Sequence, residues 1–252
     1  MVNGSAQEPL VRLRDVTYRY GDGRTALQDI SLDVYKGERV AILGNNGAGK
    51  STLLLQLNGI LRGEGEILID GIRLQRTTLQ QIRARVGLVF QDPNDQLFCP
   101  TVLEDAAFGP LHMGLAPSEA EARARRALAQ VGAAHLADRM PHHLSVGEQR
   151  RAAIATVLSM DPPLLALDEP AAGLDPPGRD ELASLLAGLE QTLLIATHDL
   201  AFVRPLCTRA VLLCDGRITA TVPMTDDGVA LLLTEAGWRP DIAPGPRTVA
   251  EP

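Results

Sequence analysis

The feature that most constrains this chain is a glycine-rich octapeptide at positions 44–51, with the sequence GNNGAGKS. It follows an apolar run at 40–43 and precedes a helix-like segment at 52–57. Glycines let the backbone curl with its N–H groups facing inward, so that a polyphosphate meets several donors and the positive end of a helix. The octapeptide therefore predicts a phosphate-binding loop between a core strand and a helix, in a protein of the α/β class.

Individual loop residues have expected roles. Lys50 is expected to reach the β- and γ-phosphates as a point charge, and the Ser51 hydroxyl to bind Mg²⁺. A side chain in place of Gly47 or Gly49 is expected to block the approach of the phosphates. The alternative is a glycine-rich turn that holds no ligand. The candidate nucleotide-binding residues here are Gly44, Asn45, Asn46, Gly47, Ala48, Gly49, Lys50, Ser51 and Thr52.

The net charge and the hydrophobicity pattern argue against nucleic acid and membrane lipid as direct partners. The 252 residues carry a net charge of -7, which argues against a general nucleic-acid binder and against docking on anionic lipid by charge alone. No apolar stretch approaches the ~18 residues needed to span a bilayer, and the first residues lack the basic and apolar segments of a secretion signal. We expect a cytoplasmic protein whose contact with a membrane is made only through partners.

The N-terminal third reads as strands. Residues 10–20 and 26–34 alternate in polarity on either side of a Gly-Asp-Gly turn, which predicts two antiparallel strands. Tyr20, just before the turn, is a candidate for stacking on an adenine ring, and the alternative is a strand aromatic that packs on its neighbours. The compact apolar run 85–90 predicts a core strand that delivers Gln91 to its end, where ligands bind in open α/β sheets.

Residues 92–163 carry helix signals and are expected to form a mostly helical insert. Ser118 and Glu121 predict a capping box that opens a helix, and Ser145 and Glu148 predict a second one, whose helix runs to Leu158. Gly147 in the first turn of that second helix leaves backbone N–H groups open to an anion. The alternative is an ordinary capped helix.

The C-terminal half alternates strands and helices. The strand at 163–168 ends in Asp168 and Glu169, and a second core strand at 192–197 delivers His198. One carboxylate is expected to hold the Mg²⁺ shell and the other to polarise a water molecule. A helix is expected at 180–189 and a hairpin at 209–222 around Asp215. This alternation is expected to bring Gln91, Glu169 and His198 to the sheet edge that holds the phosphate loop.

The order of these motifs over residues 10–222 resembles the nucleotide-binding subunit of ABC transporters. The motifs are the phosphate loop, Gln91, the segment 144–149, Asp168 and Glu169, Leu174 and Asp175, and the segment 197–199. The resemblance implies a P-loop NTPase with a RecA-like core sheet, an antiparallel β subdomain and a helical insert at about 92–163 that carries the signature segment. From the residues themselves we expect a mobile tail at 1–9 and a short C-terminal extension at 223–252.

The same resemblance implies ATP and Mg²⁺ as ligands, with a role for each residue. Tyr20 would stack on adenine, and Mg²⁺ would be bound by Ser51, Gln91 and Asp168. Glu169 would act as general base, and His198 would contact the γ-phosphate. Ser145, Gly147 and Asp175 would act on nucleotide bound to the opposite protomer of a head-to-tail dimer, formed by two copies or by two related ATPases. Val146 departs from the glycine that is commonest at this signature position.

A finer resemblance lies in residues 91–98, 108–111 and 148–151, which look like the ATPases of energy-coupling-factor importers, especially the cobalt and nickel branch. It implies an ATP-hydrolysing motor at the cytoplasmic face of the membrane, with a transmembrane coupling subunit and a substrate-capture subunit, for cobalt, nickel or a vitamin. Asp92 and Asp95 would receive an arginine-bearing coupling helix. The alternatives are the ATPase of another ABC transporter, either an exporter or a binding-protein-dependent importer, and a soluble ABC ATPase outside transport.

Overall fold

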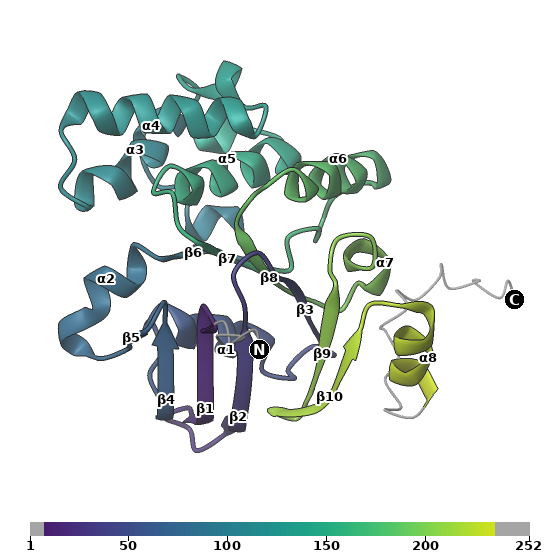
Figure 1. Cartoon of the computed structure of the whole chain (residues 1–252). Coiled ribbons are helices and arrows are strands. Elements are labelled where there is room, and N and C mark those ends of the chain that lie inside the picture. The colour runs from purple at the N-terminus through teal and green to yellow at the C-terminus, as the bar shows by residue number, and fades with distance from the viewer. Residues whose placement is uncertain (1–7, 235–252) are drawn as a thin grey trace, which may run out of the picture.

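The computed structural model of the chain describes residues 8–234 and contains two β-sheets with helices around them (Figure 1). Sheet A is antiparallel, in the strand order β2-β1-β4-β5. Its strands are β1 (Val11–Arg19), β2 (Thr25–Val34), β4 (Glu64–Ile69) and β5 (Ile72–Arg73). The turn at 21–23 joins β1 to β2, so the antiparallel pair predicted there is confirmed.

Sheet B has the strand order β10-β9-β3-β8-β7-β6 and is parallel except for its last hairpin. Its strands are β3 (Arg39–Leu43), β6 (Val86–Val89), β7 (Leu164–Asp168), β8 (Thr192–Thr197), β9 (Arg209–Cys214) and β10 (Arg217–Pro223). Because β6, β7 and β8 are parallel neighbours, their carboxyl ends lie at one edge. The edge predicted for residues 91, 169 and 198 is therefore a real feature of the fold.

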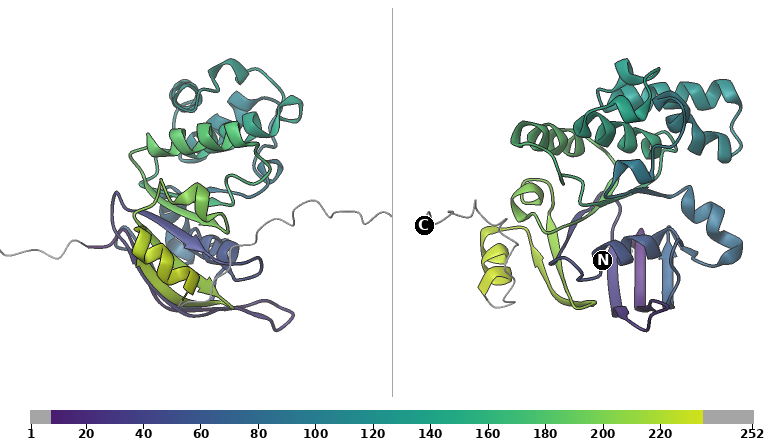
Figure 2. Two further views of the ribbon diagram at one scale, coloured as in Figure 1. Left: turned by 90° about the vertical axis from the view of Figure 1, so that its right-hand side faces the viewer. Right: turned by 180° about the vertical axis from the view of Figure 1, so that it is seen from behind.

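The helices cover both faces of sheet B. They are α1 (Lys50–Leu57), α2 (Leu79–Arg83), α3 (Val102–His112), α4 (Pro117–Gln130), α5 (Val146–Leu158), α6 (Pro176–Ala187), α7 (Leu200–Val203) and α8 (Asp226–Thr234). Short 3₁₀ turns lie at Arg76–Thr78, Pro93–Asp95, Ala134–Leu136 and Pro141–His143. Helices α3, α4 and α5 gather at one end of the molecule and sheet A at the other (Figures 1 and 2).

Two hydrophobic cores meet at sheet B. On β3, Val40 and Ile42 belong to the core that α1 shares with sheet A, whereas Ala41 and Leu43 belong to the core under the helices. Successive strand side chains point to opposite faces, so a strand covered on both sides must be apolar throughout. This explains why 40–43 reads as a continuous apolar run. The predicted fold, a P-loop NTPase core with an antiparallel β subdomain and a helical insert, is confirmed.

Some predicted helix boundaries are wrong. Helix α4 begins at Pro117 with Ala116 as its N-cap, so Ser118 lies inside the first turn and makes no capping bond. Proline at the first helical position is pre-organised for the helix and sets the start ahead of the serine. Helix α6 begins at Pro176, not at residue 180, because the Asp175 side chain accepts from the Gly178 N–H and the two prolines fit the first turn.

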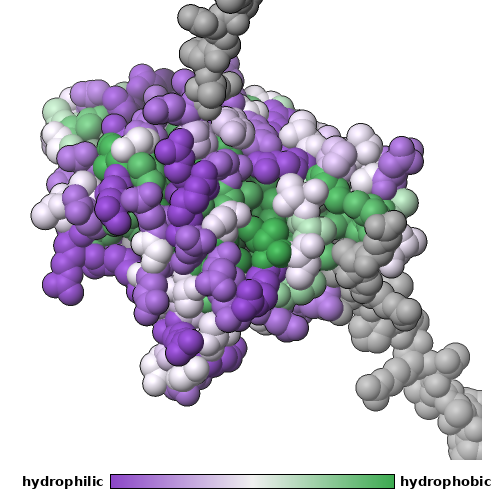
Figure 3. All heavy atoms as spheres, turned by 60° about the horizontal axis from the view of Figure 1, so that its bottom comes forward, coloured by the Kyte–Doolittle hydropathy of each residue, from purple (hydrophilic) through white to green (hydrophobic). Residues whose placement is uncertain are grey.

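Helices α2, α7 and α8 were not predicted. Helix α8 lies in the expected C-terminal extension and contacts β10. Residues 1–7 of the expected tail and residues 235–252 lie outside the described residues. Among residues 8–234, no helix is both long and apolar enough to cross a bilayer. The face in Figure 3 is largely hydrophilic, with hydrophobic side chains gathered in smaller patches.

Candidate functional site

The phosphate loop needs its glycines for two different reasons. A Cβ on Gly49 would lie 2.5 Å from the Ala26 carbonyl oxygen, and one on Gly44 would lie 2.3 Å from the Leu213 carbonyl oxygen. At both positions the protein's own backbone leaves no room for a side chain. Gly47 has no neighbour within 4 Å of such an atom, but its φ of +83 is one that other residues rarely adopt. The chain's own fold therefore already requires glycine at Gly49 through backbone contact and favours it at Gly47 through backbone conformation, and the block to phosphate approach stays a prediction.

Lys50 is the first residue of α1 and its side chain is 6% exposed. Its Nζ donates to the carbonyl oxygens of Gly44 at 2.8 Å and Asn45 at 3.3 Å, and lies 3.3 Å from Glu169 Oε1. A buried ammonium group needs such partners, because an unpaired one would be expensive to remove from water. The loop thus holds its cation at the sheet edge, beside a carboxylate.

Asp168 ends β7 and is buried, and its Oδ1 has no hydrogen-bond partner. The Ser51 hydroxyl is hydrogen-bonded to the same carboxylate. Burial raises the pKa of Asp168, while the bond to Ser51 opposes that rise. A buried carboxylate with an orphaned oxygen next to a serine hydroxyl offers the hard oxygen ligands that Mg²⁺ prefers, so these residues fit the ion.

Glu169 is held by the end of β8. Its N–H donates to the Ala196 carbonyl at 2.8 Å, the Thr197 hydroxyl donates to Oε2 at 2.7 Å, and His198 Nδ1 lies 3.0 Å from Oε1. Its φ of 42 is left-handed, which is unusual for a residue other than glycine. Asp168 and Glu169 therefore have separate neighbours: the first faces Ser51, and the second faces Lys50 and β8.

A pocket of about 230 Å³ lies over the phosphate loop. The Tyr20 hydroxyl is 2.9 Å from Thr52 Oγ1, and the Arg24 guanidinium lies 4.9 Å from the Tyr20 ring centre. The tyrosine is thus already stacked with a cation on one face. The residues that line this pocket are Tyr20, Arg24, Thr25, Ala26, Asn46, Gly47, Gly49, Lys50, Ser51, Thr52, Gln91 and Glu169.

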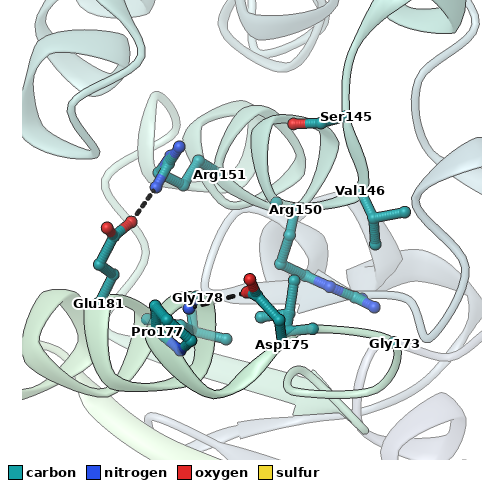
Figure 4. Close-up of a pocket in the computed structure, with 12 residues that line it drawn as sticks. Ser145, Val146, Arg150, Arg151, Gly173, Asp175, Pro177, Gly178 and Glu181 are labelled. Atoms are coloured by element: carbon teal, nitrogen blue, oxygen red, sulfur yellow. Dashed lines mark hydrogen bonds and ion pairs between the residues drawn. The ribbon is translucent and has the colours of Figure 1, made fainter.

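The signature residues lie in a different pocket, of about 420 Å³, between α5 and the start of α6 (Figure 4). Ser145 caps α5: Glu148 N donates to its hydroxyl, and the Ser145 N–H and hydroxyl both donate to the Glu148 carboxylate. The backbone bond from Ser145 is the main cause that lowers the pKa of Glu148. The second predicted capping box is therefore confirmed, and α5 ends at Leu158 as predicted.

Gly147 and Asp175 also line this second pocket. A Cβ on Gly147 would meet only Leu174 Cδ2, at 3.9 Å, so the fold of the single chain does not demand a glycine there. The two pockets share no lining residue. Within one chain the structure joins Lys50, Ser51, Asp168, Glu169 and His198 with Tyr20 and Gln91, and leaves Ser145, Gly147 and Asp175 apart from them.

Sequence reasoning assigned no role to three residues of this region. Arg150 is buried, and its guanidinium donates to the carbonyls of Phe90, Gln91 and Ala172, so α5 is tied to the segments that follow β6 and β7. Arg24 covers Tyr20, and Thr197 bonds Glu169. Thr197 and Arg150 stand in the quoted segments 197–199 and 148–151, but their roles depend on contacts with distant segments. Arg24 reaches Tyr20 across the turn at 21–23.

These features define a P-loop nucleotide-hydrolysing protein. They are a glycine loop at the start of α1, a buried lysine, and two carboxylates at the end of β7, which lies two strands from β3 in the sheet. Residues 27–172 match the family model described as ABC transporter, and the chain belongs to that family. It is an ABC transporter ATP-binding subunit that hydrolyses ATP.

Known relatives agree with this assignment. The chain is 46% identical to the energy-coupling factor transporter ATP-binding protein EcfA of Methanothermobacter thermautotrophicus over 84% of this chain and 70% of that one. Among solved structures it resembles cbiO1 from Clostridium perfringens, part of the ABC transporter complex cbiONQ, with a TM-score of 0.79, 38% identity, and coverage of 91% and 97%. It also resembles a dimeric ATP-binding cassette with ADP and Pi bound after hydrolysis, with a TM-score of 0.76, 30% identity, and coverage of 85% and 99%.

Proposed function

We propose that this chain is the ATPase motor of an energy-coupling-factor importer and works as a dimer. The observation that carries the catalytic part is the meeting of Lys50, Asp168 and Glu169 at one sheet edge beside the phosphate loop. The similarity to EcfA and cbiO1 supports the transporter class. Cobalt, nickel or a vitamin is the proposed cargo, captured by a separate subunit.

The chain's own residues supply the nucleotide-binding chemistry. Phosphate oxygens would compete with the Gly44 and Asn45 carbonyls for Lys50 Nζ, and the loop N–H groups would meet the remaining charge. Ser51, Asp168 and Gln91 would hold Mg²⁺, which when bound neutralises charge on the phosphate oxygens. Stacking of adenine on Tyr20 requires the ring face opposite Arg24, or displacement of Arg24.

Glu169 is proposed as the general base. A carboxylate accepts a proton from an attacking water only if its oxygens are aimed at that water, and the Thr197 and His198 contacts restrict where Glu169 can point. His198 is proposed to contact the γ-phosphate from the same strand end. His198 directly follows β8, and Glu169 is bonded to Thr197, the last residue of that strand.

The separation of the two pockets supports a dimer in which each chain completes the site of the other. Ser145 and Gly147 at the amino end of α5, and Asp175 at the amino end of α6, would face nucleotide bound to the partner's phosphate loop. The spare room at Gly147 fits this proposal, since the single chain gives no reason for a glycine there.

A groove of about 860 Å³ is the proposed docking surface for the transmembrane coupling subunit. Phe98 is 63% exposed and packs edge-on against Phe108, with ring centres 5.0 Å apart. The buried Asp105 accepts from the N–H groups of Phe98 and Cys99 through Oδ1 and so holds this segment in place. The two rings suit the apolar face of a helix, and the exposed Asp92 and Asp95, a few residues earlier in the chain, are proposed to receive its arginine. The proposed location is the cytoplasmic face of the membrane.

The Glu169→Gln variant tests the proposed mechanism. It keeps the size of the side chain but removes the negative charge, so ATP binding should persist, turnover should fall by about 100-fold or more, and an ATP-bound dimer should accumulate. Steady-state hydrolysis and size-exclusion chromatography with ATP measure these effects. Undiminished hydrolysis in the variant would refute the mechanism.

A further inference from the structure

The last residue of β8, Thr197, makes a contact that the proposed mechanism does not use. Thr197 is 1% exposed, and its hydroxyl donates to Glu169 Oε2 at 2.7 Å. It is shorter than the contacts of that carboxylate with His198 Nδ1 at 3.0 Å and Lys50 Nζ at 3.3 Å. A short O–H···O⁻ bond in a buried place is directional and strong.

Two neighbours set the direction of this hydrogen bond. The Asp199 N–H donates to Thr197 Oγ1 at 3.0 Å, so the hydroxyl is an acceptor on that side. A threonine hydroxyl has one proton to give, and a carboxylate can only accept, so the proton points to Glu169.

Asp199 is itself held from two sides. Its side chain caps α7 by accepting from the Phe202 N–H at 3.0 Å, and it forms an ion pair with Arg179 on α6. The loop after β8 is therefore fixed by neighbouring helices, and through it the orientation of the Thr197 hydroxyl is fixed as well.

Glu169 needs such a restraint, because it is the first residue beyond β7 and has a left-handed backbone conformation. Its carboxylate carries two oxygens that can rotate about the last torsion. The Thr197 bond to Oε2 leaves Oε1 on the side of Lys50 and His198, which is the side of the phosphate loop.

We propose that Thr197 is a positioning residue for the hydrolytic step: its hydroxyl aims the Glu169 carboxylate at the reacting water. This inference rests on the proposed role of Glu169 as general base. Thr197 acts through Glu169 and does not itself meet the nucleotide.

The test uses Thr197→Val in the full chain, which keeps the branched shape and removes the hydroxyl. We expect kcat for ATP hydrolysis to fall about 10- to 100-fold with KM for ATP within about threefold of native, because misplacement of a catalytic group affects the rate and not the ground-state binding. Thr197→Ser retains the donor and should restore kcat to within about threefold of native.

Thr192→Val is the matched control. Thr192 is at the opposite end of β8, is also 1% exposed, and accepts a hydrogen bond from the Gly37 N–H at 2.9 Å. The same substitution there removes one buried hydroxyl about 16 Å from Glu169. It should lower the melting temperature about as much as Thr197→Val does, while kcat stays within about twofold of native.

A double variant separates this inference from the proposed function. If Thr197 acts only through Glu169, then Thr197→Val should change the residual rate of Glu169→Gln by less than about twofold. Three results would each overturn the positioning role and leave the function of Glu169 intact. They are a native kcat in Thr197→Val, a loss of ATP binding in parallel with kcat, and an equal slowing by Thr197→Val in the Glu169→Gln background. Native hydrolysis by Glu169→Gln alone would overturn the proposed function instead.

Discussion

At the scale of single residues, the site depends on charged groups taken out of water. Lys50 has two carbonyls and Glu169 as partners, whereas Asp168 keeps one oxygen without any. A buried carboxylate oxygen without a partner destabilises the fold unless a ligand or a proton satisfies it. Asp168 thus places an unfavourable charge at the position of the proposed Mg²⁺ site.

The stability of the Asp168→Asn variant, measured as a function of pH, tests whether this charge is unfavourable. Because burial raises the pKa of Asp168, the folded chain binds that proton more tightly than the unfolded chain does, and stability falls as pH rises from the unfolded pKa through the folded one. Asparagine never ionises, so the variant should be more stable than native by about 1 kcal/mol at pH 8 in EDTA, or about 2 to 4 °C in Tm.

The advantage of the variant should shrink as pH falls towards 4, since Asp168 then becomes protonated in both states. Magnesium with ADP should reverse the order, because the native chain gains binding free energy that the variant lacks. Melting curves across this pH range, with and without the ligand, measure both effects. Equal or lower stability of Asp168→Asn at pH 8 in EDTA would contradict the assignment.

At the scale of elements, helix ends decide where functional groups lie. The Ser145 capping box starts α5 with Gly147 in its first turn, and Asp175 starts α6, so both amino ends open into the second pocket. The buried Arg150 links α5 to the segment that carries Gln91. Gln96 adds a second link, since its side chain bonds Ala153 and Thr156 on α5 and accepts from the Phe90 N–H. Movement of the helical segment would therefore reach the segment that carries Gln91 through these two side chains.

The groove that α3 helps to line gives the prediction at this scale. Replacement of Phe98 or Phe108 by Ser should reduce recovery of the chain with its membrane complex about tenfold, since exposed aromatic anchors each contribute more than about 1 kcal/mol to such interfaces. Leu231→Ser on α8 is the matched control, because Leu231 is also a large exposed apolar residue, 38% exposed, but lies outside the groove.

Quantitative blotting of a tagged chain in washed membranes of its own organism measures this recovery. The control variant should be recovered as well as the native chain. Loss of recovery in Leu231→Ser but not in the phenylalanine variants would move the docking surface to the other side of the molecule.

At the scale of the whole molecule, one chain holds two separate pockets, which we propose are the two halves of a shared site. The loop pocket and the signature pocket are lined by separate residues, and a head-to-tail pair of chains would bring them together twice. The solved dimeric cassette with ADP and Pi has the same fold as this chain, which makes such a pair structurally reasonable.

A mixing experiment tests whether the sites are shared between chains. Lys50→Ala disables the loop half, and Gly147→Asp disables the signature half without a clash inside the chain. Each variant alone should be inactive, whereas an equal mixture should recover up to about a quarter of native turnover, since half of the dimers carry one complete site. No recovery in a mixture that exchanges subunits would contradict a homodimer with shared sites.

The sequence predicted much of this fold because its signals are local. The run 40–43, the Gly-Asp-Gly turn and the Ser145 capping box each depend on neighbouring residues, and all three appear in the structure as predicted. The Ser118 box and the start of α6 were wrong where prolines set the first helical turn. Helix α8 was missed in a segment that was read as a tail.

By itself the sequence determined the phosphate loop, the strand ends that carry Asp168 and Glu169, and the family, because these depend on residue type and order along the chain. Only the tertiary structure decided that Thr197 bonds Glu169, that Arg150 joins three segments, and that Ser145 and Gly147 line a different pocket from the phosphate loop of their own chain. The physical reason is that a hydrogen bond between strand ends depends on sheet order and register, which no stretch of local sequence encodes.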